Sequence, residues 1–296
     1  MKEYKVVIIG CGVAGMTAAI YLARAGISCC ILEANAPGGQ IIDNGMIENY
    51  PGFLAIRGTD LALKILEQVK QLEVPVFYQK VKTIEVEEGK KIIHTSRDDF
   101  ECDYMIIATG RHPKTLGLTN EAEYVGRGVS YCAICDGALY KHKNVVVVGG
   151  SDSAFSAVRY LAKLVNHVTL IHRRKTYRAQ QALIDEVYKL NNVSFITGEV
   201  ASLQVDANKV LSSITLTDGQ VIATAALFIY IGQVPTTTAF ESLSICDENG
   251  YIQVNQQYET KIDGIYAIGD CIAKEDYQIV IAMGEAAQVA LAITRR

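Results

Sequence analysis

The stretch Lys5-Val-Val-Ile-Ile-Gly-Cys-Gly-Val-Ala-Gly15 joins a run of apolar, mostly β-branched residues to a glycine-rich turn. Such a run is typical of a strand that is buried on both faces of a parallel sheet. Met16 to Ala25 has the pattern of a helix, and Gly26 ends it. Ile27 to Leu32 is a second apolar run, followed by Glu33. The segment predicts a βαβ unit whose turn carries the spacing G-x-G-x-x-G.

The turn and Glu33 together indicate what this unit binds. Glycines in the turn allow a close backbone approach, and the start of the helix faces a pyrophosphate. A carboxylate at the end of the second strand accepts hydrogen bonds from ribose hydroxyls and repels a 2′-phosphate. The unit therefore predicts FAD or NAD as ligand, not NADP. In the alternative interpretation, Gly15 only lets helix and strand pack and Glu33 is a solvated strand end.

The same pattern recurs about 140 residues later, a second unit of the same nucleotide-binding type. Asn144-Val-Val-Val-Val-Gly149 is a predicted strand, and Gly149-Gly-Ser-Asp-Ser-Ala154 is the turn. Phe155 to Leu164 has the pattern of a helix, and Val168 to His172 is the next strand. Two such units imply two dinucleotide-binding domains in one chain.

The second turn differs from the first, because Ser151 stands where a middle glycine is usual. The strand after it is followed by Arg173, Arg174 and Arg178, with Lys175 among them. Guanidinium groups bind phosphate in a fork, so this cluster predicts NADPH, which carries a 2′-phosphate. The alternative is a solvated basic edge on a domain that has lost its ligand.

Two strand-like runs, Tyr104 to Gly110 and Ala226 to Gly232, each reach a proline three residues later. Proline disfavours continuation as helix or sheet, so we expect two crossings between domains here. A closing helix over residues 279–293 would return to the first domain. The predicted fold class is α/β, with two Rossmann-like, three-layer domains, the second inserted in the first. The expected ranges are 1–112 with 236–296, and 113–235.

Composition narrows the functional class. Of 296 residues, 50% are hydrophobic and 20% charged, as in a globular protein with a substantial core. A net charge of −4 gives no reason to propose nucleic acid or an anionic membrane as partner. No apolar run reaches the roughly 18 residues of a membrane span. Met1 to Lys5 leads directly into a strand, so we expect no signal peptide and a cytoplasmic location.

Six of the eight cysteines lie in or beside apolar runs, where a cysteine behaves as a small hydrophobe. Cys132 and Cys135 instead share the loop-like segment Cys-Ala-Ile-Cys-Asp-Gly137. Structural zinc needs four ligands, and the chain has no second C-x-x-C. A static disulfide is unexpected in a reducing compartment. Redox exchange is the favoured interpretation, with Asp136 as proton donor and acceptor.

The position of the pair adds to this interpretation. It lies between the two nucleotide units in the sequence, shortly before the first strand of the second. Flavin, nicotinamide and dithiol in one chain compose an electron path from NADPH through FAD to the disulfide, and from the dithiol to an external disulfide.

Several stretches, in this order, resemble the low-molecular-weight thioredoxin reductases over nearly the whole chain. The matching stretches are Gly10-Cys-Gly-Val-Ala-Gly15, Pro37-Gly-Gly-Gln40, Ile47-Glu-Asn-Tyr-Pro-Gly52, Ala108-Thr-Gly110, Gly128-Val-Ser-Tyr-Cys-Ala-Ile-Cys-Asp-Gly137, His172-Arg-Arg174 with Arg178, and Ile268-Gly-Asp270.

The resemblance implies a set of site residues. Cys135 would lie against the flavin, Cys132 would attack the partner, and Asp136 would be the acid–base group. Thioredoxin or a similar protein would accept the electrons, and the enzyme would be a homodimer with a hinge at the two crossings. The FAD positions implied are Gly10, Gly12, Ala14, Gly15, Glu33, Gly39, Gln40, Asn49, Ala108, Thr109, Gly110, Gly269, Asp270, Gln278 and Ile279. The NADPH positions are Gly150, Ser151, Asp152, Ser153, His172, Arg173, Arg174 and Arg178.

The chain departs from the family pattern at some positions. Ser151 replaces a glycine, Ser156 stands where acidic residues are common, and Thr236 replaces an asparagine. Tyr277 stands where an arginine often precedes the glutamine near the flavin. Two alternatives to an NADPH-dependent reductase therefore stay open. One is a reductase with another donor, such as reduced ferredoxin, and the other is a non-enzymatic redox sensor.

Overall fold

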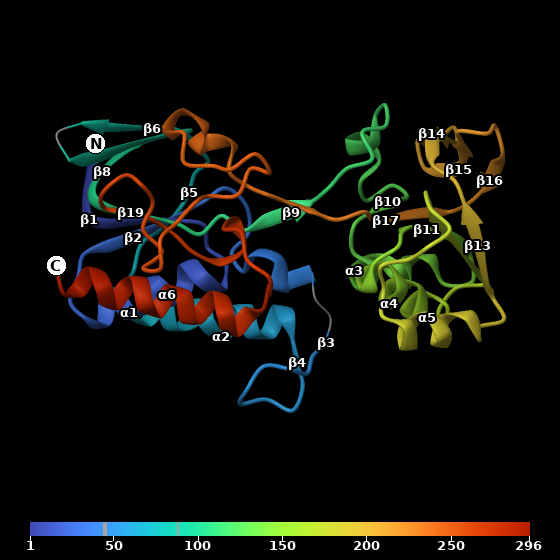
Figure 1. The fold of residues 1–296 in the computed structure, drawn as a ribbon, viewed down its shortest axis with the longest axis horizontal. Helices are drawn as coiled ribbons and strands as arrows, with labels where there is room; N and C mark the ends of the chain where they lie inside the picture. Colours follow the sequence, from blue (N-terminus) through green and yellow to red (C-terminus); the bar gives the residue numbers. More distant parts are fainter. Residues whose placement is uncertain (44–45, 88) are drawn as a thin grey trace. The chain divides into compact units, whose positions relative to one another are not determined.

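A computed structural model describes residues 1–43, 46–87 and 89–296 of the chain (Figure 1). The chain divides into two compact units. Unit 1 comprises residues 1–112 and 234–296, and unit 2 comprises residues 113–233. The second boundary thus falls slightly before the expected position. Each unit is built on a parallel sheet, so the predicted α/β class with Rossmann-like domains is confirmed.

The sheet of unit 1 has the strand order β5-β2-β1-β8, with β19 beside β8. These five strands run parallel. The second halves of β1 and β8, residues 6–9 and 105–107, are wholly apolar and are buried on both faces of the sheet. The bounds are β1 Lys2–Ile9, β2 Cys29–Glu33, β5 Val76–Tyr78, β8 Asp99–Ile107 and β19 Ile265–Ala267.

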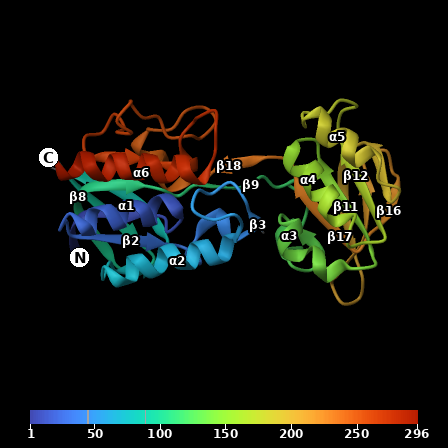
Figure 2. The same cartoon turned by 90° about the horizontal axis from the view of Figure 1, so that it is seen from below.

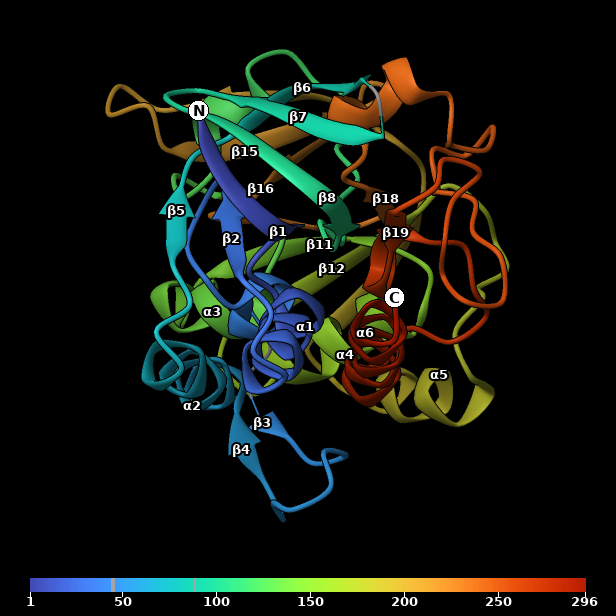
Figure 3. The ribbon, with the colours of Figure 1, turned by 90° about the vertical axis from the view of Figure 1, so that its left-hand side faces the viewer.

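Three helices, α1 (Val13–Arg24), α2 (Gly58–Gln71) and α6 (Ile279–Thr294), cover one face of this sheet (Figures 2 and 3). α1 begins earlier than predicted, because the last residues of the glycine turn already form its first turn. The prediction for α6 is confirmed at its first residue, Ile279.

A hairpin covers the opposite face of the unit 1 sheet (Figure 3). It consists of β6 (Val81–Glu87) and β7 (Lys90–Thr95), and β7 also pairs with the first half of β8. The 3-10 turn η4 (Thr238–Leu243) packs on the same face through Phe240. Shorter elements between β2 and α2 are η1 (Gly39–Asp43), β3 (Met46–Ile47) and β4 (Ile56–Arg57).

Unit 2 has a parallel sheet in the order β10-β17-β11-β12-β13. β11 and β17, both apolar, are its buried centre. β11 occupies the residues predicted for it. The bounds are β10 Val129–Ser130, β11 Asn144–Gly149, β12 His167–His172, β13 Val193–Thr197 and β17 Ala226–Tyr230.

Helices and a small antiparallel sheet cover the two faces of the unit 2 sheet. One face is covered by three helices, α4 (Asp152–Leu161), α5 (Gln181–Tyr188) and the short α3 (Ala133–Asp136). The turn η3 (Gly137–Tyr140) follows α3 in the chain. The other face carries β14 (Val200–Val205), β15 (Leu211–Leu216) and β16 (Val221–Ala223), with η2 (Glu121–Tyr124) before β10. Unit 2 thus has the three layers that the sequence predicts.

The two crossings correct one expectation. The prolines were expected to prevent sheet structure, but β9 (Arg111–Pro113) and β18 (Gln233–Pro235) pair as a two-stranded ribbon. Each proline is the last residue of its short strand, where its missing N–H removes little from the ladder. Within the described part of the chain, none of the helices is long and apolar enough to cross a membrane.

Candidate active site

Two glycines of the first turn make the close packing of strand, turn and helix feasible. A Cβ on Gly10, whose φ is +110°, would overlap the carbonyl oxygen of Ala108 and approach Thr109. A Cβ on Gly15 would overlap the carbonyl oxygen of Gly10. Gly10 therefore allows the end of β1 to lie against the residues that follow β8, and Gly15 allows the start of α1 to lie against the end of β1.

The start of α1 is open toward a ligand. Gly12 is the N-cap residue and has no side chain with which to satisfy the first N–H groups of the helix. The loop after β2 lies against this turn, because the Gly38 N–H donates to the Cys11 carbonyl (2.8 Å). A Cβ built on Gly12 would lie 3.9 Å from the Cα of Gly39. Backbone N–H groups beside a glycine-lined surface are what a pyrophosphate needs.

Glu33 ends β2 beside the same turn. Its carboxylate accepts the N–H of Cys11 at 2.6 Å and that of Asn35 at 2.8 Å. The side chain is only half-buried, so lone pairs remain for ribose hydroxyls. The geometry fits the sequence prediction for this residue.

Side chains from distant segments come together on the same unit. The Asn49 amide donates to Gln278 Oε1 (3.1 Å), and the Gln40 amide donates to the Arg111 carbonyl (2.8 Å). A Cβ on Gly269 would touch Ala14 at 3.2 Å. The residues predicted for FAD are thus gathered around α1, the loop after β2, and the starts of β9 and α6.

Arg111 is a charged residue of this region that the sequence reasoning did not single out. Its guanidinium donates to Asp270 (3.1 Å) and lies 3.5 Å from the ring centroid of Tyr277. Tyr277 is the residue that departs from the family pattern, where an arginine is common. In this chain the cation beside position 277 comes from β9.

Asp270 is held by a second network. The Gly269 N–H donates to Glu285 of α6 (2.7 Å), and the Lys274 ammonium donates to both oxygens of Glu285 (2.7 and 2.9 Å). Glu285 is buried, and this pairing satisfies its charge. The network fixes the turn η5 (Gly269–Cys271), which carries Asp270.

Unit 1 also contains polar atoms that lack a partner within the described residues. They are Tyr266 Oη and, near the glycine turn, Thr109 Oγ1 and Arg111 Nε, all buried. Buried polar groups are normally hydrogen-bonded. Together with the open start of α1 and the glycine-lined turn, the Thr109 and Arg111 atoms fit the polar groups of an FAD molecule.

The second turn has the same course with a different surface. Gly149 is tight against β17, since a Cβ there would overlap the carbonyl oxygen of Tyr230. Ser151 has φ −104° and ψ 174°, an extended conformation that serine adopts without strain. The Arg178 N–H donates to the Gly150 carbonyl (2.7 Å), and Asp152 accepts the N–H of Gln180 (2.7 Å). The segment with the arginines is thereby held against the turn.

The basic cluster is free to meet an anion. Arg173, Arg174 and Arg178 are exposed, and in the described residues none of them forms an ion pair. The His172 ring lies where a side chain on Gly150 would be, and its Nδ1 is 2.9 Å from the Arg174 carbonyl. Ser153 is exposed in the first turn of α4. These residues fit a phosphorylated nucleotide, because the segment that carries exposed arginines is held against the turn before α4, whose start has no side-chain cap.

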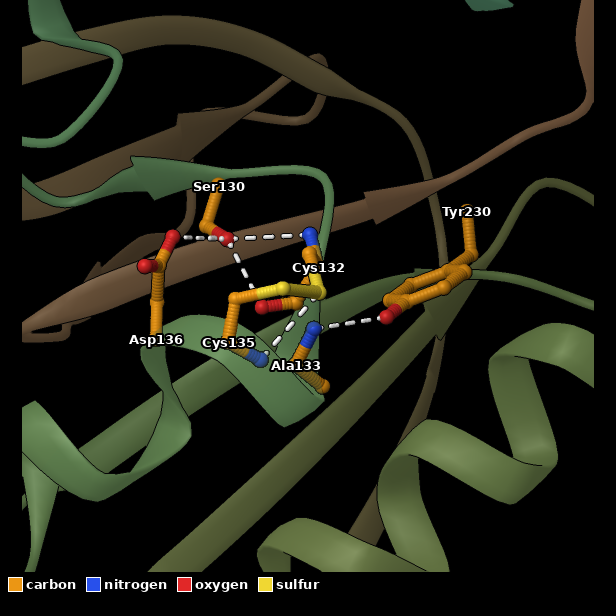
Figure 4. Close-up of a disulfide and its surroundings, with 6 residues drawn as sticks. All are labelled: Ser130, Cys132, Ala133, Cys135, Asp136 and Tyr230. Atoms are coloured by element: carbon orange, nitrogen blue, oxygen red, sulfur yellow. Dashed lines mark hydrogen bonds between the residues drawn. A yellow bond between two sulfur atoms is a disulfide. The ribbon is translucent and has the colours of Figure 1, made fainter. Parts of the chain in front are cut away.

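Cys132 and Cys135 are joined by a disulfide across the single turn of α3 (Figure 4). Cys132 is the N-cap residue, and its sulfur accepts the N–H of Cys135 at 3.1 Å. Cys135 is exposed and Cys132 half-buried. Gly137 lets the following turn approach α4, where an added Cβ would lie 2.9 Å from Leu161.

Asp136 and the turn are held by residues outside the C-x-x-C motif (Figure 4). Asp136 Oδ2 accepts the hydroxyl of Ser130 at 2.7 Å. The Ala133 N–H donates to the Tyr230 hydroxyl at 2.7 Å. The sequence reasoning missed both residues, because Ser130 was only part of a matching stretch and Tyr230 only part of an apolar strand.

The six other cysteines have free thiols. Burial raises the pKa of Cys11 to about 12, and that of Cys29 and of Cys271 to about 11. Burial also raises the pKa of Cys30, Cys102 and Cys246. These groups stay protonated and unreactive near neutral pH. The redox chemistry of the chain is thus concentrated in one pair.

Comparison with known proteins agrees with this arrangement. The family model of pyridine nucleotide-disulphide oxidoreductases matches residues 4–292. A thioredoxin reductase of Listeria innocua is 43% identical over 291 residues, which cover 96% of this chain and 91% of that protein. The crystal structure of Lactococcus lactis thioredoxin reductase is 38% identical with a TM-score of 0.89, and 99% of this chain and 98% of that chain are covered.

A further solved structure matters for the electron donor. A ferredoxin-flavin thioredoxin reductase of Clostridium acetobutylicum is 32% identical with a TM-score of 0.55, and 100% of this chain and 98% of that chain are covered. Full-length matches at these identities leave no doubt about ancestry. The chain belongs to the pyridine nucleotide-disulphide oxidoreductase family and, within it, to the low-molecular-weight thioredoxin reductases of the bacterial type.

Proposed function

We propose that this protein is a flavoprotein disulfide reductase that passes electrons from NADPH through FAD and the Cys132–Cys135 pair to the disulfide of thioredoxin. The observation that carries the proposal is a disulfide-bonded C-x-x-C turn with a tethered carboxylate, in a chain with two dinucleotide-type βαβ units. The βαβ unit of unit 1 ends in a carboxylate, which disfavours a 2′-phosphate, and that of unit 2 ends in a basic cluster, which favours one. The charge of each site therefore selects its nucleotide.

In this proposal unit 1 holds FAD. The N–H groups at the start of α1 bind the pyrophosphate and Glu33 binds the ribose. Arg111, Asp270 and Gln278 line the remainder of the site. When bound, FAD accepts a hydride and passes electrons singly or in pairs, a chemistry that no side chain of this protein supplies.

Unit 2 holds NADPH. The start of α4 binds its pyrophosphate, with the Ser151 hydroxymethyl beside it, and Arg173, Arg174 and Arg178 bind the 2′-phosphate. A serine with unstrained backbone adds one hydroxyl donor to the turn and takes some space from the phosphate.

The dithiol then reduces the acceptor by thiol–disulfide exchange. The Cys132 thiolate attacks one sulfur of the acceptor disulfide, that S–S bond breaks, and the leaving sulfur takes a proton. The Cys135 thiolate next attacks Cys132 Sγ, the mixed disulfide breaks, and the second acceptor sulfur takes a proton. The enzyme ends as disulfide and the acceptor as dithiol, and Asp136 carries the proton that leaves Cys135.

The test is rapid mixing of the FAD-loaded protein with NADPH. We expect bleaching of the flavin absorbance within seconds, followed by multiple turnovers with oxidised thioredoxin. Cys135→Ser is expected to keep FAD and its bleaching and to lose all turnover, since no dithiol can form. Loss of FAD from this variant would identify the pair as structural, and absent turnover with any thioredoxin would favour the sensor alternative.

A second candidate donor is reduced ferredoxin. Ser151 in the phosphate turn favours it, together with the likeness to the Clostridium ferredoxin-flavin enzyme. The same mixing experiment separates the two donors. A flavin that stays oxidised for minutes with NADPH but bleaches with reduced ferredoxin establishes the second.

We further propose a homodimer in the cytoplasm. A surface on unit 1 supports self-association, because apolar residues such as Met46, Phe53 and Leu63 line a shallow hollow of about 740 Å³ together with the charged Arg57, Asp60 and Lys64. Leu54 is 99% exposed beside this hollow. Such a surface suits a twofold axis, where a protruding side chain of each copy enters the hollow of the other. The free thiols of the described chain suit a reducing compartment. Sedimentation of the wild type as a dimer and of Leu54→Glu as a monomer tests the assembly.

A further inference from the structure

Ser130 is the last residue of β10 and is buried, with 2% of its surface exposed. Its hydroxyl lies between the carboxylate of Asp136 and the backbone of Cys132 (Figure 4). It accepts the Cys132 N–H at 3.0 Å, and Asp136 Oδ2 lies 2.7 Å away on its other side. One side chain thus connects both ends of the redox turn.

The single proton of this hydroxyl has two acceptors in reach. These are Asp136 Oδ2 at 2.7 Å and the Cys132 carbonyl at 3.2 Å. A hydroxyl donates one hydrogen bond, and bonds to an ionised acceptor are shorter and stronger. The proton therefore goes to the carboxylate. Since Ser130 is anchored in the sheet, its bond restricts where the half-buried carboxylate can lie.

The opposite side of the turn is held in the same manner. The Tyr230 hydroxyl accepts the Ala133 N–H, and Tyr230 ends β17, the strand that pairs with β10. Tyr140 follows the turn, and burial first and the charge of Asp136 second raise the pKa of its phenol. The phenol of Tyr140 is therefore close enough to Asp136 to respond to the charge of its carboxylate.

We propose that Ser130 is a positioning residue for Asp136, whose carboxylate its buried hydroxyl fixes against the redox turn for proton exchange with the Cys135 thiol. The inference rests on the proposed function. The serine itself neither gains nor loses a proton overall. As Cys135 Sγ attacks Cys132 Sγ, the thiol proton passes to Asp136 and then to the leaving acceptor sulfur.

A single-turnover experiment tests this role. The FAD-loaded protein is reduced with one equivalent of NADPH and mixed with increasing concentrations of oxidised thioredoxin. The chain contains no tryptophan, so tryptophan fluorescence reports the acceptor alone. Ser130→Val is compared with Ser130→Thr, because threonine has the shape of valine but keeps the hydroxyl. Thr169→Val is the control, because it removes a buried hydroxyl from β12 of the same sheet.

We expect Ser130→Val to lower the limiting rate of exchange about tenfold. This is less than acid–base catalysis usually contributes, because Asp136 is still present but is held less firmly. The thioredoxin concentration at half-saturation and the bleaching of flavin by NADPH stay unchanged. Ser130→Thr regains most of the rate, and Thr169→Val keeps all of it. In an Asp136→Asn background, Ser130→Val causes no further loss, because the serine acts through that carboxylate.

Three outcomes overturn the proposal. Ser130→Val and Ser130→Thr with equal rates would show that the hydroxyl is irrelevant. A tenfold loss that persists in the Asp136→Asn background would assign Ser130 to folding of the turn. Full exchange in Asp136→Asn itself would remove the acid–base role together with this proposal, whereas turnover with NADPH in that variant would leave the reductase function standing.

Discussion

The turns Gly10–Gly15 and Gly149–Ala154 follow the same backbone path, but they differ in the residues that surround them. Their second motif residues, Gly12 and Ser151, are both N-caps with extended backbone, at φ −78° and ψ −175° and at φ −104° and ψ 174°. A glycine is not required at this place by the backbone, because serine adopts the same conformation. A middle glycine in such a turn is therefore explained by the space that a ligand or a neighbouring loop needs, and not by the backbone conformation.

The surroundings of the two turns agree with that interpretation. Gly12 and Ser151 are both half-exposed, but only Gly12 has a glycine loop, that of Gly38 and Gly39, packed beside it. The first unit pairs its charges internally, with Glu33 on backbone N–H groups and Arg111 on Asp270. The second unit leaves Arg173, Arg174 and Arg178 exposed and, in the described residues, without an ion pair. A closed site suits a cofactor that stays bound, and an open one suits a substrate that leaves.

The largest expected effect comes from the last residue of each turn. In Gly15→Ala the new Cβ would overlap a backbone oxygen, so we expect a loss of about 3 kcal/mol of stability and of bound FAD. In Ala154→Gly, at the matching place, we expect a loss of about 1 kcal/mol of stability, because glycine has a lower helix propensity than alanine. The FAD content should stay normal. Thermal melting and flavin absorbance measure both. Equal losses would show that the two turns are equally tight.

The arginines after β12 come next. Arg173→Ala combined with Arg174→Ala should raise the KM for NADPH about 100-fold, since two charge-assisted bonds to the 2′-phosphate are lost. The KM for NADH should change little. Arg159→Ala, which removes a charge paired with Glu186, is the control. A similar rise for both nucleotides would mean that the cluster does not recognise the 2′-phosphate.

Arg111 tests the closed site. Arg111→Gln should weaken FAD binding about tenfold, because the cation over Tyr277 and the partner of Asp270 are lost together. Restoring a cation nearby with Tyr277→Arg in the same chain should recover part of the affinity. FAD titration of the apoprotein, followed by flavin fluorescence, gives the constants. Unchanged affinity in Arg111→Gln would show that the residue only anchors β9.

The smallest effect is expected at Ser151. Ser151→Gly removes a hydroxymethyl beside the expected pyrophosphate and should lower the KM for NADPH roughly threefold, with stability nearly unchanged. A rise in KM would instead show that the hydroxyl donates to the phosphate. If NADPH fails to bleach the flavin in the variant as well, the serine is not the reason and another donor is required.

Local patterns sufficed for the elements that carry the site. β11 and the start of α6 lie where apolar runs and their flanking residues predict them, because buried strands and helices need such runs wherever they occur. The crossings were predicted less well. Pro113 and Pro235 each end a short strand. These strands form only because they pair with each other, although more than 100 residues separate them in the sequence.

The sequence by itself determined the two nucleotide units, the charge that each presents and the isolated C-x-x-C pair with its aspartate. These features are local, since spacing and residue type along a few turns decide them. The structure showed that Ser130 bonds Asp136 within the same short segment, and only the tertiary fold brought Tyr230 to Ala133 and Arg111 to Tyr277 and Asp270. Such contacts depend on which strands become neighbours and on how side chains pack, and no short pattern encodes them.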